Sequence, residues 1–510
     1  MNHEAALYTV AEIRTIEQAA MSGLSPGTLM RRAGQAAAAA ALALLPSPRS
    51  EARVLVLAGP GNNGGDALET AFNLAQAGLQ VTVLLQTNPA HYPADAQQAL
   101  GRAKSSPVHF ADPVLAPDFL SAPWSLVVDG LFGIGLNRPI GAVQVALIKN
   151  INRLDCLVLA LDVPSGLMAD TGAIVGTEGV ALRASHTITF IGNKPGLHTG
   201  YGRDFAGKVS VAALGVDEKC FVRPQAQLGH TGLFSHLLRR RRHNSHKGSF
   251  GDVAVIGGAH GMGGAPILAA HAAAKCGAGR VFAGFVEEPP AYDSTHPELM
   301  CRLARDLDFS AATLVAGPGL GNSLTAHDLL AKALDAATPL VLDADALNLL
   351  AAEPGLRQKL VQRTIQAVLT PHPLEAARLL GLQVAEVQAD RLSAARAMAR
   401  QFNAVVVLKG SGTVIARPDG EAVINPTGNP ALATAGTGDV LAGICGALLA
   451  QQWTAWEAAL AAVWMHGRAA DEMVEQGIGP IGLTAGELIP CVRAILNRLT
   501  AEHAPLHPAR

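Results

Sequence analysis

The segment that decides the fold is "VLVLAGPGNNGGDALET", residues 54–70. It reads as an apolar strand, a glycine-rich loop and the start of a helix. The strand is apolar at consecutive positions, which indicates burial on both faces, as in a parallel sheet. Gly59, Gly61 and Gly64 match G-x-G-x-x-G. That match alone is weak, because the next strand ends at Gln86, where a dinucleotide-binding fold usually offers an acid to the ribose.

The same alternation of strand and helix continues through the 510 residues. Further strands are predicted at 81–86, 126–133, 157–166, 186–192, 253–258, 280–285, 312–319, 340–347, 367–372 and 404–413. The length and this alternation predict two different α/β domains. Each is expected to have a doubly wound sheet between two layers of helices, and the first domain is expected to be Rossmann-like. We expect the first domain at 1–220, a linker at 221–245 and the second domain at 246–503.

Composition narrows the class of partner. Hydrophobic residues make up 49% of the chain and the formal net charge is −2. No global field therefore favours nucleic acid or an anionic membrane. The one basic run, Arg239 to Arg242, fits a solvated linker, with a nucleic-acid patch as the alternative. Six scattered cysteines without a C-x-x-C pair predict reduced thiols and a cytoplasmic protein. We also expect a homo-oligomer.

Polar residues in the first domain gather where strands end. The loop after the first strand offers Asn62, Asn63, Gly64, Gly65 and Asp66. Its glycines let a phosphate approach the backbone at a helix N-terminus. The alternative is a tight turn in which Asp66 only caps the helix.

Later strands of the same domain add more charged groups. Asp129 and Asp162 each follow a strand, Gly133 and Gly135 form a second glycine loop, and Lys194 follows the last strand. Two such acids favour a ligand cleft over two coincident helix caps. Lys194 is a candidate cation for a pyrophosphate, or an acid–base partner.

These segments resemble the NAD(P)H-hydrate epimerase domain from the start of the chain to about Gly215. The shared stretches are "GPGNNGGD", "VVDGLFGIGLNRPIG", "ALDVPSGLMADTG" and "FIGNKPG". The resemblance implies a potassium ion bound by Asn63, Asp129 and Ser165. It also implies that the hydrated dinucleotide is held by Asn62, Asn63, Gly64, Gly65, Asp66, Gly133, Ile134, Gly135, Leu136, Asn137, Arg138, Pro139 and Asp162. Ala67 departs from the family's glycine, and its methyl group is expected to narrow the loop.

The second domain carries an acid at a predicted helix start. In "AGTGDVLAG", residues 435–443, Gly436 to Gly438 place backbone amides before an apolar helix, which predicts an anion site. Asp439 is then placed as a base beside a phosphate, and the alternative is an acid that only stabilises the helix dipole. No G-x-x-x-x-G-K-[ST] occurs in the sequence, so the second domain is no P-loop enzyme.

Two more strand ends of this domain offer polar groups. Lys409, Gly410, Ser411, Gly412 and Thr413 suit nucleotide phosphates, and the alternative is a hairpin turn. His372 lies between two prolines that we expect to aim its ring.

This half resembles the ribokinase-like NAD(P)H-hydrate dehydratase family from about His246 to about Ala501. The matching stretches include "GPGLG", "DADALNLL", "TPHPLEAARLLG", "LKGSGT" and "NPTGNPALATAGTGDVLAG". The resemblance implies that the hydrated dinucleotide is contacted by Ala265, His372, Asp439 and either Gly319 or Gly321. It implies that the adenine nucleotide is contacted by Lys409, Gly410, Ser411, Gly412, Thr413, Gly436 and Gly438. Met262, Gly263 and Ala435 are small departures from the family pattern.

Together the two resemblances imply an isomerase and a lyase on one chain. The first domain would convert (6R)- to (6S)-NAD(P)H hydrate, with Asp162 and Lys194 as catalytic candidates. The second would dehydrate the S epimer with Mg²⁺, Asp439 accepting a proton. ADP is expected as co-substrate because the fused arrangement resembles bacterial members. The expected partners are NADH hydrate, NADPH hydrate and ADP, without nucleic acid or membrane. The alternatives are a vitamin-precursor kinase for the second domain and a non-catalytic binding module for the first.

Overall fold

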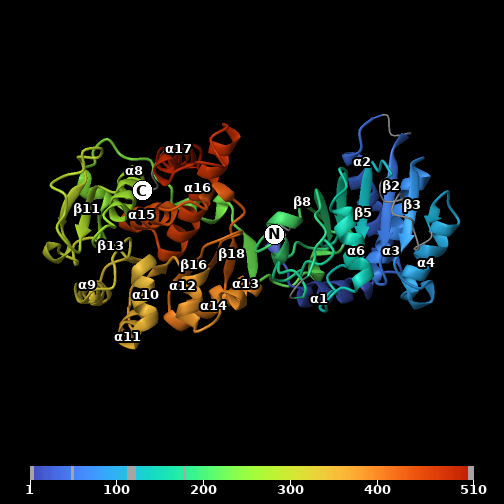
Figure 1. Cartoon of the computed structure of the whole chain (residues 1–510), viewed down its shortest axis with the longest axis horizontal. Helices are drawn as coiled ribbons and strands as arrows, with labels where there is room; N and C mark the ends of the chain where they lie inside the picture. The colour runs from blue at the N-terminus through green and yellow to red at the C-terminus, as the bar shows by residue number, and fades with distance from the viewer. Residues whose placement is uncertain (1–4, 48–50, 112–121, 177–178, 504–510) are drawn as a thin grey trace. The chain divides into compact units, whose positions relative to one another are not determined.

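The structure, a computed structural model, describes residues 5–47, 51–111, 122–176 and 179–503. The chain forms two compact units, Met1–Gln227 and Leu228–Arg510 (Figure 1). Each unit is built around one sheet with helices on both faces, so the predicted α/β class with two three-layer domains is confirmed. No helix in the described ranges is both long and apolar enough to cross a membrane.

The first unit has a seven-stranded sheet in the order β4-β3-β2-β5-β6-β7-β8, and every neighbouring pair is parallel. Its strands are β2 (Arg53–Ala58), β3 (Gln80–Leu85), β4 (His109–Ala111), β5 (Leu126–Gly130), β6 (Leu157–Leu161), β7 (His186–Phe190) and β8 (Lys208–Ala212). Its helices are α1 (Val10–Met21), α2 (Thr28–Leu44), α3 (Asn62–Gln76), α4 (Ala94–Lys104), α6 (Ala142–Ile151) and α7 (Gly202–Phe205). A short strand, β1 (Ala6–Leu7), pairs with β9 (Ala226–Leu228).

Consecutive apolar residues of β2 face opposite cores, as the opening segment predicts. Val54 and Val56 pack in the core that α1 to α4 cover. Leu55 and Leu57 pack in the core that α6 covers. Side chains alternate along a strand, so a strand between two helical layers must be apolar at every position.

The second unit has a sheet in the order β18-β17-β16-β15-β14-β13-β10-β11-β12. Its strands are β10 (Asp252–Gly257), β11 (Arg280–Phe285), β12 (Met300–Leu303), β13 (Thr313–Ala316), β14 (Leu340–Leu342), β15 (Val368–Leu369), β16 (Val405–Leu408), β17 (Val414–Ala416) and β18 (Ala422–Ile424). Strands β10 to β16 are parallel, but β17 and β18 are antiparallel. Residues Lys409 to Thr413 therefore form the turn of the hairpin between β16 and β17. The sequence had suggested such a hairpin turn as the alternative to a nucleotide-binding segment.

Helices cover both faces of this second sheet (Figure 1). One layer is α8 (Gly264–Lys275), α15 (Thr437–Ala450), α16 (Ala455–Glu475) and α17 (Ala485–His503). The other contains α9 (Leu324–Asp335), α10 (Ala344–Ala352), α11 (Pro354–Val361), α12 (Pro373–Leu380), α13 (Val384–Ala389) and α14 (Arg391–Phe402). Because the parallel strands all run the same way, their carboxyl ends bring Asp343, Thr370 and Lys409 to one edge.

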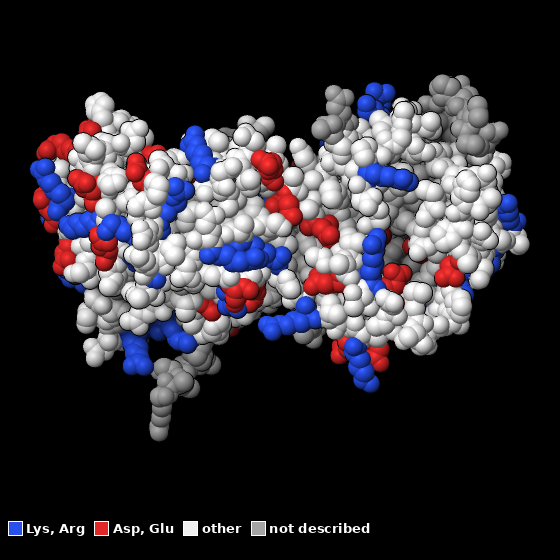
Figure 2. Space-filling model, turned by 90° about the horizontal axis from the view of Figure 1, so that it is seen from below, with Lys and Arg blue, Asp and Glu red and all other residues white. Residues whose placement is uncertain are grey.

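The segment expected to be a linker has structure of its own. Residues 221–245 contain two 3₁₀ turns and β9, and they bury Phe234 and Leu238 in the core of the second unit. The face seen in Figure 2 shows Lys and Arg side chains interspersed with Asp and Glu, in keeping with the near-neutral net charge.

Candidate functional site

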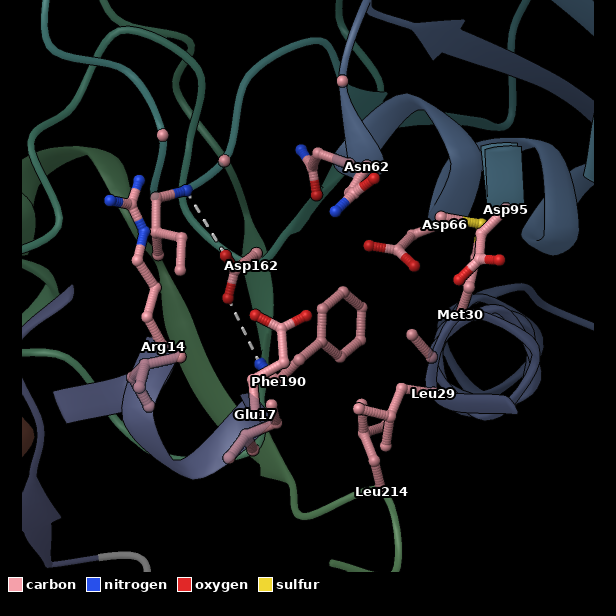
Figure 3. Close-up of a pocket in the computed structure, with 18 of the residues that line it drawn as sticks. Arg14, Glu17, Leu29, Met30, Asn62, Asp66, Asp95, Asp162, Phe190 and Leu214 are labelled. Carbon is pink, nitrogen blue, oxygen red and sulfur yellow. Dashed lines mark hydrogen bonds between the residues drawn. The ribbon is translucent and has the colours of Figure 1, made fainter. Parts of the chain in front are cut away.

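A cavity of about 640 Å³ opens at the carboxyl ends of the first sheet. It is lined by the loops after β2 and β5, by Asp162 and Phe190 at the ends of β6 and β7, and by α1 and the start of α2. Figure 3 shows the carboxyl groups of Glu17, Asp66 and Asp162 pointing into this space from different elements. A cleft of this size suits a ligand as large as a nucleotide.

Asp162 is held in one orientation by several donors. Its φ is 65°, in a region that non-glycine residues seldom adopt. Its Oδ1 accepts from the Lys194 Nζ at 2.5 Å and from the Phe190 amide at 3.3 Å. Its Oδ2 lies 3.4 Å from the Ile134 amide in the second glycine loop. Such strain at a cavity wall is typical of a functional residue.

Lys194 lies behind Asp162 and does not line the cavity. Its Nζ also donates to the Thr189 hydroxyl at 2.6 Å and the Phe190 carbonyl at 2.8 Å. All three protons of the ammonium group therefore have acceptors. The side chain is fully buried. Burial lowers the pKa of Lys194, and the Asp162 carboxylate opposes that shift. In this place Lys194 orients Asp162 and balances its charge.

Two further carboxyl groups face Asp162. Burial, and then the negative charge of Asp162, raise the pKa of Asp66 well above its ordinary value. The same two causes raise the pKa of Glu17. The cavity therefore combines an ion-paired carboxylate with acids that hold protons more tightly than usual.

Of the three residues expected to bind potassium, Asp129 and Ser165 are hydrogen-bonded to each other, and Asn63 lines the cavity beside Gly133. Asp129 is fully buried and accepts from the Ser165 hydroxyl at 2.7 Å and the Ser165 amide at 2.8 Å. Burial raises the pKa of Asp129 to about 6. Within the described residues, both amide atoms of the buried Asn63 side chain lack a hydrogen-bond partner.

Most of the residues expected to bind substrate in this unit line the cavity, but three do not. A side chain at Gly64 would meet the Gly59 carbonyl at 1.9 Å, and one at Gly65 would meet Met30, so both glycines allow close packing. Pro139 also lies outside the lining. Ala67 does not narrow the loop, because its methyl group is fully buried against Gly130 of β5.

Sequence reasoning missed much of the cavity wall. The missed lining residues that Figure 3 labels are Arg14, Glu17, Leu29, Met30, Asp95, Phe190 and Leu214. Several come from α1 and α2, which precede the glycine loop in sequence and carry no motif typical of a binding site. The capping box of Thr9 and Glu12 marked the start of α1, but nothing in the sequence indicated which face of α1 meets the cavity.

A second charged cluster lies at the carboxyl edge of the second sheet. Asp439 is in the first turn of α15, which begins after Gly436, whose φ of 88° favours glycine. A side chain at Gly438 would lie 3.2 Å from the Lys409 Nζ and 3.8 Å from Asp343. The structure thus brings the glycine turn, the hairpin lysine and a strand-end aspartate together.

Lys409 forms an ion pair with Asp343, an acid that sequence reasoning did not single out. The Lys409 Nζ lies 2.8 Å from Asp343 Oδ1, which also accepts from the Thr370 hydroxyl at 2.8 Å. Burial, then Asp343, raise the pKa of Asp439 to about 7, while Lys409 opposes the shift. A carboxyl group with that pKa is suited to accept a proton near neutral pH.

His372 caps helix α12 with its ring. Its Nδ1 accepts from the backbone amides of Leu374 and Glu375, at 3.1 and 3.3 Å, and its Nε2 lies 3.2 Å from Glu375 Oε1. Burial lowers the pKa of His372 and raises that of Glu375 to about 7. The imidazole orientation follows from this cap, together with Pro373 at the first helical position.

The remaining predicted residues border the same edge. A side chain at Gly319 would come within 2.7 Å of the Met262 carbonyl and 3.4 Å of Ala265, so these loops are in contact. The amide of Gly321 donates to Asp345 at 2.8 Å. Arg391, which was also missed, is buried beneath the hairpin and donates to the carbonyls of Leu408 and Lys409.

The Lys194–Asp162 pair gives a prediction about stability. Replacing Lys194 with Met leaves Asp162 as a buried, uncompensated charge, and we expect a loss of about 3–5 kcal/mol in the free energy of unfolding. The exposed Lys104 of the same unit is the control. Lys104→Met should change that free energy by less than about 0.5 kcal/mol. Urea unfolding of the full chain measures both.

A double variant sharpens this test. Lys194→Met combined with Asp162→Asn should recover part of the loss, because neither remaining group is charged. A Lys194→Met protein as stable as Lys104→Met would show that the pair does not hold this site.

Comparisons with known proteins support the family resemblance of each half of the chain. Residues 26–196 match the family described as YjeF-related protein N-terminus, and residues 253–490 match NAD(P)H-hydrate dehydratase. The chain is 42% identical over 503 residues to the bifunctional NAD(P)H-hydrate repair enzyme Nnr of Coxiella burnetii, covering 96% of this chain and 99% of that protein.

Two shorter matches cover the second unit. The chain is 48% identical to the ADP-dependent (S)-NAD(P)H-hydrate dehydratase of Neisseria meningitidis, over 52% of this chain and 92% of that one. A crystal structure of ADP/ATP-dependent NAD(P)H-hydrate dehydratase from Bacillus subtilis is 31% identical, covers 53% of this chain and 97% of that one, and has a TM-score of 0.46. By the full-length match, the chain belongs to the family of bifunctional NAD(P)H-hydrate repair enzymes.

Proposed function

We propose that this chain repairs hydrated nicotinamide cofactors in two steps. The first unit epimerises (6R)- to (6S)-NAD(P)H hydrate, and the second dehydrates the S epimer to NAD(P)H while ADP becomes AMP and phosphate. The observation that carries the proposal is that each family region contains a strand-end cluster in which a lysine forms an ion pair with a buried aspartate. The full-length relative of Coxiella burnetii is named for both activities together.

In the second unit the residues serve phosphoryl transfer. The hydroxyl on C6 attacks the terminal phosphorus of ADP, the bond to AMP breaks, and Asp439 accepts the hydroxyl proton. The Gly436–Gly438 amides at the start of α15 stabilise the charge on the transferring group, as helix N-termini do. The ring nitrogen lone pair then expels phosphate from C6, and loss of a C5 proton restores the double bond. This sequence converts a poor leaving group, hydroxide, into a good one.

A magnesium ion would neutralise phosphate charge during this transfer. Mg²⁺ in such sites is usually held by one or two carboxylates together with substrate phosphates. No group of three or more His, Cys, Asp or Glu among the described residues forms a metal cage by itself. Asp343 and Asp345 are our candidates for these one or two carboxylates, because both carboxyl groups lie near Asp439 and raise its pKa.

ADP as the phosphoryl donor is supported by the dehydratase of Neisseria meningitidis, which is named for it. Lys409 to Thr413 and Gly438 are the residues we assign to the nucleotide. Ala265, His372 and Gly319 or Gly321 are assigned to the hydrated dinucleotide. A homo-oligomer and a cytoplasmic location stay predictions.

In the first unit, Asp162 is our candidate for the group that moves the proton needed for epimerisation at C6. Its ion pair with Lys194 holds the carboxyl group in place at the cavity wall, where it faces a bound substrate. Asp66, with a raised pKa, is placed across the cavity to donate one. Lys194 acts as a positioning residue in this scheme.

Potassium is proposed for the set of Asn63, Asp129 and Ser165. Carboxylate, amide and hydroxyl oxygens suit a hard cation. The buried side-chain amide of Asn63 has no hydrogen-bond partner among the described residues, which supports its use as a ligand. We expect epimerase activity to fall when K⁺ is replaced by a bulky organic cation. Asn63→Leu should abolish both the K⁺ stimulation and any K⁺-dependent rise in melting temperature. Full activity of the protein without any alkali cation would contradict this assignment.

Asp439 gives the most direct test of the dehydratase chemistry. Asp439→Asn should lower the turnover of (S)-NADH hydrate by at least about 10²–10⁴-fold, because the proton acceptor is lost, and should leave epimerase activity intact. Glu457 is the matched control, since it also lies in the first turn of a helix, α16, but far from any glycine turn in sequence. If Glu457→Gln and Asp439→Asn lose the same small amount of activity, Asp439 only stabilises its helix.

The raised pKa of Asp439 predicts a pH dependence. A base must be ionised, so kcat/KM of dehydration should rise with pH through about 7 and level off above it. Lys409 lowers the pKa of Asp439, so the rise of kcat/KM should move to higher pH in Lys409→Gln. Glu375 also has a pKa of about 7. If the rise of kcat/KM with pH disappears in Glu375→Gln, the titrating group is Glu375 and not Asp439.

A further inference from the structure

The second unit has a basic cavity that the proposed function does not use. It encloses about 1030 Å³ at the C-terminal ends of α8 and α15, beside α17. Its described lining contains six cationic side chains and no Asp or Glu: Arg239, Arg240, Arg241, Arg242, Lys275 and Arg493. The four arginines at 239–242 are exposed, and a cleft lined by one sign of charge raises the local concentration of anions.

Three of the arginines are fixed by the protein. Arg240 donates to the Ala501 carbonyl at 3.1 Å. Arg241 donates to the Gly277 carbonyl at 2.6 Å and stacks over Phe250 at 3.7 Å. Arg239 donates to carbonyls of its own turn. A guanidinium has five N–H groups, so these bonds hold the arginines in place and leave donors and charge free.

Helix capping explains only part of this arrangement. Arg240 and Arg241 satisfy carbonyls at the ends of α17 and α8, where a cation is favourable. Arg242 and Arg493 have no such use, because neither side chain forms a hydrogen bond or ion pair within the described residues. None of the five arginines pairs with a described carboxylate, whereas Lys275 lies 3.5 Å from Glu298.

The neutral part of the lining suits a nucleotide. Phe250 and Trp453 offer aromatic surface, and Asn244, Ser245 and Asn497 add polar groups at the rim. Arginine forks bind phosphate oxygens in pairs, and a guanidinium or aromatic ring stacks on a base. We propose that this cavity binds a nucleotide with two or more phosphate groups, at a site separate from the cluster of Asp439 and Lys409.

The separation follows from the helices. Asp439 and Gln451 lie at opposite ends of α15. They are twelve positions apart in sequence, which corresponds to roughly 18 Å along a helix axis. Ala265 and Lys275 likewise lie at opposite ends of α8. A ligand in the basic cavity would therefore contact neither Asp439 nor Lys409.

The test compares the number of ATP sites per full-length chain by isothermal titration without Mg²⁺. We expect the double variant Arg242→Gln/Arg493→Gln to lose one site relative to wild type, with about 100-fold weaker binding there, because two charge-assisted contacts are removed. Neither side chain supports the fold, so melting temperature and dehydratase turnover should not change. Arg400→Gln, an exposed arginine on α14 outside the cavity, should keep every site.

Three results would overturn the proposal. The first is an unchanged number of ATP sites in the double variant. The second is inorganic sulfate binding the cavity as tightly as ATP, which would make it a site for any anion. The third is a single-stranded RNA that binds there more tightly than ATP. None of these readouts depends on the catalytic assignments, so their failure is distinguishable from a failure of the proposed function.

Discussion

A lysine that forms an ion pair with a buried aspartate at the end of a parallel strand is the interaction on which both sites depend. In the first unit Lys194 pairs with Asp162, and in the second Lys409 pairs with Asp343. In each site a second acid, Asp66 or Asp439, lies close enough for the paired aspartate to raise its pKa and for the lysine to oppose that effect. Burial is the larger cause in both.

This shared arrangement serves two different purposes. In the first unit the paired aspartate itself faces the cavity, and the lysine is hidden behind it. In the second unit the pair lies beside a glycine turn at the start of α15, where backbone amides favour an anion. The first geometry suits proton transfer to or from a bound substrate, and the second suits phosphoryl transfer. The parallel sheet makes both possible, because it delivers strand ends from distant parts of the sequence to one edge.

The sequence was most informative where local rules are strict. The strand–loop–helix pattern at residues 54–70 predicted burial on both faces, and the glycine turn before Asp439 predicted a helix start; both are confirmed. The cavity wall from α1 was not predictable, because Glu17 faces Asp66 only through tertiary packing. Asp343 was not singled out either, since its role rests on the parallel strand order β14-β15-β16, which brings Lys409 to it. The antiparallel β17 and β18 were missed because short strands carry little periodicity.

The most direct test of two-step repair mixes the purified chain with Mg²⁺, K⁺, ADP and an equilibrated mixture of both NADH-hydrate epimers, and follows NADH absorbance. We predict complete recovery of NADH in a single phase. An Asp162→Asn protein should recover only the S fraction quickly, followed by a slow drift. Partial recovery by the unaltered chain, identical to that of Asp162→Asn, would show that the first unit does not epimerise and would contradict the two-step account.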